Sequence, residues 1–260
     1  MLTVLRYLAA AICAAFAIAS TRIEQSPVAV ERADHKRYAA VAFDYFVLFN
    51  PDSVMAAVER NAPGKGREFT NLWRTRQFEY SWLRSITGRY VDFLDITKDA
   101  LVYTANAMHV EMTAAARQQL VEAYLRLTPW PDTADALRRL RDADVRVITI
   151  ANFSPTMLRS NAESAGLMPL FDALVSTDAN HTYKPDPRAY QLGVDRLELD
   201  KREIVFAAFG GWDAAGAKSF GYPTVWVNRL NQPHEELGLR PDRTVADLNG
   251  LLDFVLKQEQ

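Results

Sequence analysis

Residues 38–49 read YAAVAFDYFVLF, an apolar run that is interrupted by a single carboxylate, Asp44. A charged segment, residues 31–36, precedes the run. A short apolar run of this kind predicts a buried strand of a parallel sheet that ends at Asp44. Open α/β sheets bind ligands at the carboxyl ends of their strands, so Asp44 is a candidate nucleophile or metal ligand. The alternative is an aspartate that caps a turn after the strand.

The second half of the chain alternates between strand and helix patterns. This alternation predicts a doubly wound α/β core, in which helices cover both faces of a parallel, Rossmann-like sheet. We expect strands at residues 145–150, 173–176, 204–208 and 224–228. The strand at residues 224–228 is expected to be the last one in the chain. We expect helices at residues 132–141, 154–165, 186–196, 212–220 and 245–257.

The segment between the first strand and this alternation has a different pattern. Its apolar and aromatic residues recur at helical spacing from residue 67 to residue 127, and no strand pattern occurs there. We therefore expect an all-helical cap domain, residues 50–129, inserted into the α/β core domain. The core domain would comprise residues 37–49 and 130–257.

The N-terminal residues have the layout of a secretory signal peptide. An unbroken apolar segment, residues 7–19, follows Arg6 and ends in small residues that suit cleavage before Ser20. We expect a signal peptide at residues 1–19, a linker at residues 20–36, and a periplasmic or secreted protein. The alternative is a retained N-terminal anchor, although the segment is short for a membrane span. The single cysteine, Cys13, lies in this segment, so the mature chain would have no thiol.

Composition and charge narrow the class of function. The net charge is −2, and without a basic excess we do not expect a nucleic acid partner. The four histidines show no spacing typical of a zinc site, which argues against a histidine metal centre.

Four polar residues follow the predicted strands and should converge at one edge of the sheet: Asp44, Asn152, Lys184 and Asp213. A cation such as Lys184 near Asp44 would hold that carboxylate ionised and could stabilise charge during a reaction. The alternative for Lys184 is a solvated surface group, and for Asp213 a carboxylate favoured by the dipole at a helix start. Arg74, among aromatic residues of the cap, is either a stacked structural cation or an anion-binding group.

Several longer segments resemble a known family. Residues 72–84 read LWRTRQFEYSWLR and continue into GRYVDF at residues 88–93. Further segments are YKPD at 183–186, GWDA at 211–214 and FGYP at 220–223. From about residue 39 to residue 252, the chain is similar to the haloacid dehalogenase superfamily, and closely to its L-2-haloacid dehalogenase (type II) branch.

The resemblance implies a reaction without metal or cofactor. Asp44 would attack C2 of an L-2-haloacid, expel the halide with inversion and form an ester that water then hydrolyses. Lys184 and Asp213 would lie against the nucleophile and position the water, and Tyr190 would support Lys184. The resemblance also implies a homodimer, to which the cap surface could contribute.

The resemblance further assigns the substrate pocket. Arg74 and Asn152 would bind the departing halide, and Phe93 and Trp212 would form walls of the pocket. Phosphatases of the superfamily carry a second aspartate two residues after the nucleophile, where this chain has Phe46. Phe46 therefore argues against phosphoryl transfer.

The chain also departs from the usual motifs of the branch. Asp-x-Tyr-Gly-Thr-Leu-Phe is replaced by DYFVLF at residues 44–49, which is one residue shorter and lacks the glycine and the threonine. Ser-Asn-Gly is replaced by Ala151-Asn152-Phe153, and Ser-Ser-Asn before the Trp-Asp pair is replaced by Ala208-Phe209-Gly210. The lost groups orient the nucleophile and bind the substrate carboxylate in the branch, and Phe153 and Phe209 would occupy space that a small polar substrate uses.

We therefore expect an exported hydrolase of the 2-haloacid dehalogenase type, with Asp44 as nucleophile and a modified pocket. One alternative is a binding protein that keeps the fold but has lost turnover, and a weaker alternative is a small-molecule phosphatase. The modified pocket has two interpretations, drift without chemical demand or adaptation to a more apolar substrate, and the sequence leaves both open.

Overall fold

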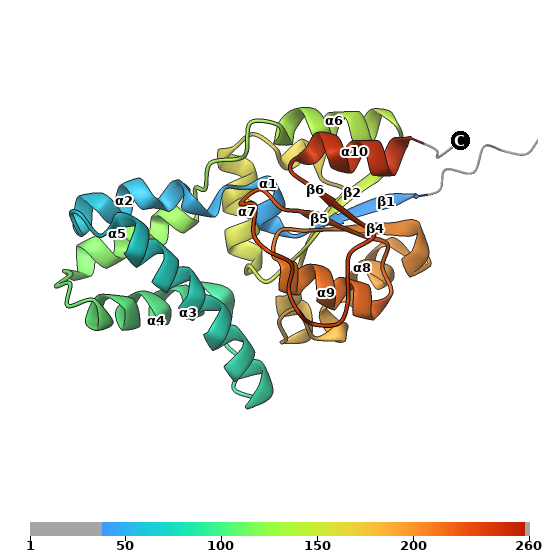
Figure 1. The fold of residues 1–260 in the computed structure, drawn as a ribbon. Helices are drawn as coiled ribbons and strands as arrows, with labels where there is room; N and C mark the ends of the chain where they lie inside the picture. The colour runs from blue at the N-terminus through green and yellow to red at the C-terminus, as the bar shows by residue number, and fades with distance from the viewer. Residues whose placement is uncertain (1–37, 258–260) are drawn as a thin grey trace, which may run out of the picture. The chain divides into compact units, whose positions relative to one another are not determined.

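The structure is a computed structural model that describes residues 38–257 (Figure 1). The predicted signal peptide, linker and Cys13 lie outside the described residues. Within the described part, six strands form one sheet in the order β3-β2-β1-β4-β5-β6, and all neighbouring strands are parallel. The strands are β1 (Ala40–Phe43), β2 (Arg146–Ala151), β3 (Ala173–Ser176), β4 (Ile204–Ala208), β5 (Thr224–Val227) and β6 (Arg243–Val245).

This strand order is the doubly wound order in which the direction of winding reverses between β1 and β4. Phe43, the last residue of β1, is in register with Thr149 of β2 and Ala207 of β4. The next residue, Asp44, donates its backbone N–H to the Ala207 carbonyl at 2.9 Å. Asp44 therefore lies at the position where open α/β sheets place their ligands.

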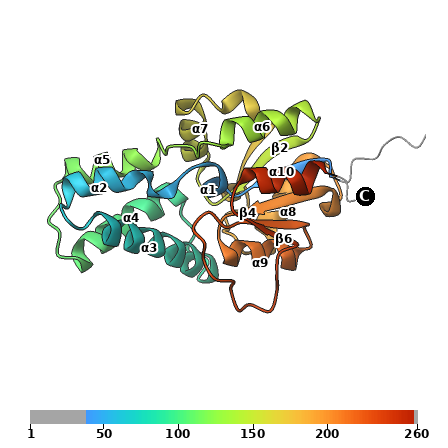
Figure 2. The same cartoon turned by 45° about the horizontal axis from the view of Figure 1, so that its top comes forward.

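Both faces of the sheet are apolar and covered by helices. In β1, Val41 and Phe43 pack into one apolar cluster, whereas Ala40 and Ala42 pack into another. The first cluster includes residues of α6, α7 and α10, and the second includes residues of α8 and α9, on the opposite face (Figure 2). These helices are α6 (Thr133–Asp142), α7 (Pro155–Ser164), α8 (Pro187–Leu197), α9 (Gly211–Phe220) and α10 (Leu248–Leu256).

A helical insert separates β1 from the rest of the sheet, as the sequence predicts. The chain leaves the core after a short helix and returns beside it, where Phe49 and Pro129 form an antiparallel bridge. The Asn50 N–H donates to the Thr128 carbonyl at 2.8 Å at the same crossing. The elements from β1 to this return are α1 (Tyr45–Leu48), η1 (Pro51–Val54), α2 (Met55–Asn61), α3 (Gly66–Ile86), α4 (Phe93–Ala107) and α5 (Ala114–Tyr124).

Local sequence signals explain where several helices begin. The side chain of Asn50 caps η1, those of Asp92 and Thr113 cap α4 and α5, and that of Ser154 caps α7. Pro155 follows Ser154 at the first helical position, where a missing N–H costs nothing. Three 3₁₀ turns complete the core: η2 (Met168–Leu170), η3 (Thr177–Asn180) and η4 (Lys201–Glu203).

The prediction was wrong at the C-terminal end of the sheet. Residues 224–228 were expected to form the last strand and residues 245–257 the last helix, but Val245 belongs to the additional edge strand β6. Two of the three residues of β6 are exposed, so the strand lacks the apolar run that marks buried strands. Helix α10 begins only after Asp247, whose side chain accepts from the Gly250 N–H.

Candidate active site

Asp44 follows β1 and precedes the short helix α1. Its backbone is extended, and its side chain accepts no hydrogen bond from the first turn of α1. The structure therefore gives the Asp44 side chain no capping role. Its side chain is 15% exposed, and Oδ1 lies 2.9 Å from the Lys184 Nζ. Asp44 is thus a carboxylate that is ion-paired on one oxygen and still accessible.

Lys184 lies between two carboxylates. Its Nζ is 2.7 Å from Asp213 Oδ2 in addition to its contact with Asp44, and its side chain is fully buried. Burial by itself would lower the pKa of Lys184, but the carboxylates of Asp213 and Asp44 outweigh this effect and raise the pKa above its ordinary value. Lys184 is therefore a fixed ammonium charge, not the solvated surface group that was the alternative. We call Asp44, Lys184 and Asp213 the charged cluster.

Asp213 lies in the first turn of α9 and is fully buried. Its Oδ1 accepts a 2.7 Å hydrogen bond from the Tyr190 hydroxyl, and its Oδ2 accepts from Lys184. Burial raises the pKa of Asp213 to about 6, although Lys184 and Tyr190 oppose the shift. Asp213 therefore contributes more than a helix-start charge, since it can exchange a proton near neutral pH. Tyr190 contacts Asp213, so its support of Lys184 is transmitted through this carboxylate.

Asn152 follows β2 and joins this edge of the sheet to Lys184. Its Oδ1 accepts from the Lys184 backbone N–H at 2.9 Å. Its Nδ2 is buried and has no hydrogen-bond partner among the described residues. A buried donor left unpaired costs about 1–3 kcal/mol, so Nδ2 is available to a bound acceptor. The four residues expected at one edge of the sheet do meet there.

The contacts of Arg74 are of another kind. On α3, its Nη1 lies 2.6 Å from Asp52 Oδ1 and its Nη2 lies 3.0 Å from Asn71 Oδ1. The structure thus gives Arg74 an ion pair with η1 rather than a contact with the charged cluster or the aromatic stacking that was the alternative. Halide binding by Arg74 stays a prediction.

Aromatic rings surround the approach to Asp44. Phe46 lies edge-on to Phe153 and Phe209, with ring centroids 5.4 and 5.8 Å apart, and to Phe78 at 6.5 Å. The two rings predicted as pocket walls join the same group, because Phe93 stacks on Phe153 and Trp212 lies edge-on to Phe78. We call these residues the aromatic cluster: Phe46, Phe78, Phe93, Phe153, Phe209 and Trp212.

The three non-aromatic replacements lie at or just after the ends of β2 and β4. Ala151 and Ala208 are buried at the ends of β2 and β4, where neither offers a hydroxyl. Gly210 precedes α9, and a Cβ at this position would lie 2.7 Å from the Trp212 Nε1. The indole of Trp212 therefore occupies space that a side chain at position 210 would need.

Several residues that contact this region were not identified from the sequence. Trp82 of α3 donates from Nε1 to the Lys184 carbonyl at 3.1 Å, and Tyr183 donates to the Val91 carbonyl at 2.6 Å. Both contacts tie the helical insert to the segment that carries Lys184. Trp82 belongs to the helical spacing of the insert and Tyr183 to the YKPD segment, but neither pattern predicted these contacts.

Arg229 is a second residue that sequence reasoning missed. Its Nε and Nη2 donate to the Val47 carbonyl at 3.1 and 3.0 Å, and it pairs with both oxygens of Asp132. Trp130 Nε1 donates to the neighbouring Phe46 carbonyl at 3.0 Å. These bonds satisfy carbonyls of α1, which has no room for internal partners. They therefore fix the turn that follows Asp44.

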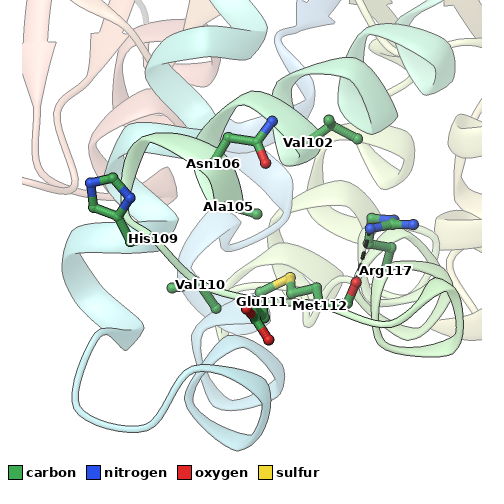
Figure 3. Close-up of a pocket in the computed structure, with 8 residues that line it drawn as sticks. All are labelled: Val102, Ala105, Asn106, His109, Val110, Glu111, Met112 and Arg117. Atoms are coloured by element: carbon green, nitrogen blue, oxygen red, sulfur yellow. Dashed lines mark hydrogen bonds between the residues drawn. The ribbon is translucent and has the colours of Figure 1, made fainter.

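Two pockets differ in their relation to this site. One, of about 590 Å³, is lined in part by Trp82, Tyr183 and Trp212, and so adjoins the residues that hold the charged cluster. The other, of about 480 Å³, is formed by α4 and the segment that leads to α5 (Figure 3). In Figure 3, Asn106 and His109 lie on one side of it and Arg117, which donates to the Met112 carbonyl, on the other. None of its lining residues was predicted for the site.

Among residues 38–257, no group of three or more histidine, cysteine or acidic side chains is arranged to hold a metal ion. The same range contains no helix with the length and apolar character needed to cross a membrane.

Comparison with known proteins places the chain in a family. A profile described as haloacid dehalogenase-like hydrolase matches residues 6–221. The chain is 41% identical to an (S)-2-haloacid dehalogenase of Pseudomonas sp. (strain YL) over 82% of its own length and 93% of that protein. It is 38% identical to haloacetate dehalogenase H-2 of Moraxella sp. (strain B), over 85% and 99% of the two chains.

A solved structure is similar over the same range. It is the L-2-haloacid dehalogenase of Xanthobacter autotrophicus with chloropropionic acid covalently bound, and it is 35% identical, with a TM-score of 0.79 over 85% of this chain and 100% of that chain. Sequence and fold agree, and the chain therefore belongs to the haloacid dehalogenase-like hydrolases, in the branch of the L-2-haloacid dehalogenases.

Proposed function

We propose that this protein hydrolyses the carbon–halogen bond of L-2-haloacids through an ester on Asp44. The observation that carries the proposal is the charged cluster, in which a buried ammonium lies between an accessible carboxylate and a buried one. The relatives named above support it, because they are haloacid dehalogenases and one of their structures holds its substrate covalently.

In the first step, the free oxygen of Asp44, Oδ2, attacks C2 of the substrate from the side opposite the halogen. A carbon–oxygen bond forms, the carbon–halogen bond breaks, and the halide leaves with the bonding electron pair, which inverts C2. The unpaired Nδ2 of Asn152 is the donor that the structure offers to a negatively charged group here. Lys184 holds the other oxygen of Asp44 in place, which orients the attacking one.

In the second step, water attacks the carbonyl carbon of the Asp44 ester. Lys184 lies beside Oδ1 and stabilises the negative charge that develops on this oxygen. Asp213 acts as the base, because an acid with a pKa of about 6 is largely ionised at neutral pH and can accept a proton. Breakdown of the intermediate releases the 2-hydroxy acid and restores the Asp44 carboxylate. One proton of the water ends on the product hydroxyl, and the other passes through Asp213 to solvent. The proposed route uses no metal and no cofactor.

A second candidate is a binding protein of the same fold without turnover. The packing around position 210 favours it, because Trp212 fills the space beside Gly210, and Ala151 and Ala208 supply no hydroxyl donors. Loss of one preorganised donor typically lowers an enzymatic rate by about 10²–10³-fold. This candidate predicts that ligands bind without forming an ester.

Halide release from the purified full-length chain separates the two candidates. We expect release from L-2-chloropropionate and from longer L-2-bromo acids, little release from the D-enantiomers, and none from the Asp44→Asn variant. Equal rates for the native chain and the variant on every acid would favour the binding protein.

We also propose that the protein is exported, with residues 1–19 as a cleaved signal peptide and a periplasmic or secreted mature chain. The support is the sequence pattern alone, since these residues lie outside the described range. N-terminal sequencing of protein recovered from the periplasm should begin at Ser20. Recovery of the intact N-terminus in the cytoplasm or the membrane would contradict export by cleavage.

A homodimer is the oligomeric state that we propose. Its support is the resemblance to the branch together with exposed apolar side chains on the helical insert, among them Val102 and Tyr103. Light scattering of the purified protein should give twice the mass of the chain, and a single-chain mass at micromolar concentration would contradict the proposal.

A further inference from the structure

The pocket of about 590 Å³ beside the charged cluster has the size of a small-molecule site. Two indole rings, Trp82 and Trp212, form part of its wall, and their centroids lie 5.4 Å apart. Ile86 at the end of α3 and Leu237 add two apolar side chains that are 82% and 58% exposed. Large apolar side chains that remain exposed around a concave surface indicate a site that a ligand covers.

The pocket is joined to the charged cluster through the backbone. Tyr183 and Pro185, the residues on either side of Lys184, both line it. Trp82, on helix α3 of the insert, contacts the same segment, because its Nε1 donates a hydrogen bond to the Lys184 carbonyl. Trp212 is also adjacent to Asp213 in the chain. A ligand in this pocket therefore contacts the chain neighbours of Lys184 and Asp213, the two charged partners of Asp44.

Rings pack closely around Phe46, which follows Asp44 by two residues. Phe46 and Phe153 are almost fully buried against each other, and Phe209 packs on Phe46. A substrate whose carboxylate and C2 lie at Asp44 therefore has the rings of Phe46, Phe153 and Phe209 as neighbours. Trp212 belongs both to the aromatic cluster and to the wall of the pocket, so the rings lead from Phe46 through Phe78 to the pocket.

A negative charge at the pocket determines which end of a ligand it can accept. Asp186 lines the pocket and is held ionised, because hydrogen bonds from Arg188 lower its pKa. A fixed negative charge disfavours a carboxylate in the pocket and leaves an uncharged group as the suitable occupant. The Ser85 oxygen, buried in the wall without a hydrogen-bond partner among the described residues, leaves a place for one neutral polar atom.

We propose that this pocket binds the apolar C2 substituent of the substrate, and that the substrate class is 2-haloacids with one carboxylate and an arylalkyl or long alkyl chain. The assignment rests on the proposed dehalogenase function for the reaction. The carboxylate and C2 remain at Asp44, while the chain extends along Trp212 to Ile86 and Leu237. The replacement of polar pocket residues by phenylalanine is, in this account, an adaptation to an apolar substrate.

Binding of two acids without halogen tests the assignment independently of catalysis. Isothermal titration of the full-length chain with butyrate and with 4-phenylbutyrate compares the same carboxylate with and without an aromatic end. Burial of the ring should tighten binding at least about tenfold. Equal affinities, or no binding of either acid, would overturn the assignment.

Charged substitutions locate the binding surface. Ile86→Glu and Leu237→Glu should each weaken binding of 4-phenylbutyrate about tenfold and leave butyrate unchanged, because a carboxylate would replace apolar contact. Leu83→Glu and Leu239→Glu are the matched controls, since both residues are exposed and lie on the same two segments outside the lining. If all four variants bind 4-phenylbutyrate equally, the pocket is not the site.

Turnover separates failure of this assignment from failure of the proposed function. If the preference for 4-phenylbutyrate persists but no 2-haloacid releases halide, the apolar acid site stands and the dehalogenase function fails. If halide is released, the ratio of kcat/KM for 2-bromo-4-phenylbutyrate over 2-bromopropionate should exceed one and fall about tenfold in Ile86→Glu. An unchanged ratio would overturn the pocket assignment and leave the dehalogenase function intact.

Discussion

Two regions with opposite chemistry meet at Asp44. On one side, Lys184 and Asp213 of the charged cluster are buried, and the ion pairs and hydrogen bonds of the cluster are 2.7–2.9 Å long. On the other side, the aromatic cluster presents rings that contact one another by packing alone. Under the proposed function, the chain keeps charged groups that would support a carboxylate nucleophile. The resemblance to the branch implies that it has replaced groups that would bind a small polar substrate.

Replacement of Lys184 by methionine should have the largest effect on the charged cluster. The change leaves Asp213 buried without its cation, which typically costs about 3–5 kcal/mol of stability. Halide release should be lost in the same variant. Urea unfolding and a halide assay measure the two effects.

Lys218→Met is the control for this change. Lys218 pairs with Asp242 at the surface at 2.6 Å, and exposed pairs contribute about 0–1 kcal/mol. If Lys184→Met and Lys218→Met unfold at the same urea concentration and both release halide, the charged cluster does not have the role described.

Removal of a ring should affect the aromatic side in a different way. Phe153→Ala deletes a buried side chain that contacts both Phe46 and Phe93, and such deletions cost about 3–5 kcal/mol. The pH dependence of halide release should not change, because no charge is altered. Thermal unfolding measures the loss of stability, and initial rates at several pH values measure the pH dependence. The control is Phe171→Ala, which removes a half-buried ring. A shifted pH profile in Phe153→Ala would show that the two regions are coupled.

A smaller effect is expected in the pH dependence of kcat, which depends on Asp213 of the charged cluster. Asp213 must be ionised to accept a proton, so kcat should fall tenfold for each pH unit on the acid side of its pKa. In the ester this acid limb should lie below the value of about 6, because ester formation removes the Asp44 charge that helps to raise the pKa of Asp213. Tyr190 donates to Asp213 and thereby lowers its pKa, so Tyr190→Phe should raise this pKa and move the acid limb to higher pH.

Tyr124→Phe is the control, because the Tyr124 hydroxyl donates to Gln77 and contacts no member of the charged cluster. An acid limb that moves to lower pH in Tyr190→Phe, or moves equally in both variants, would contradict the role of Asp213.

The sequence was sufficient for the parts of the fold that depend on local pattern. The predicted strands 173–176 and 204–208 match β3 and β4, because each begins with an uninterrupted apolar run. The expected meeting of Asp44, Asn152, Lys184 and Asp213 followed from the rule that parallel strands end at one edge. Strand β6 was missed because a short exposed edge strand has no such run.

Contacts between segments that are distant in the chain could not be predicted from the sequence. Arg229 binds the Val47 carbonyl 182 residues away, and no local signal marks this pair. The partner of Arg74 was also unpredictable, because Asp52 lies 22 residues away on another element. Phe153 and Phe209 were recognised as replacements, but their common packing on Phe46 depends on how β2 and β4 flank β1.

The most direct test of the account is the fate of oxygen from water. If Asp44 forms an ester that water cleaves at the carboxyl carbon, repeated turnover in ¹⁸O-labelled water must place heavy oxygen in the Asp44 side chain. Mass spectrometry of the peptide that contains Asp44, after turnover of an L-2-bromo acid, should show this label. Turnover that leaves the peptide unlabelled and puts the heavy oxygen directly into the hydroxy acid would contradict a covalent role for Asp44.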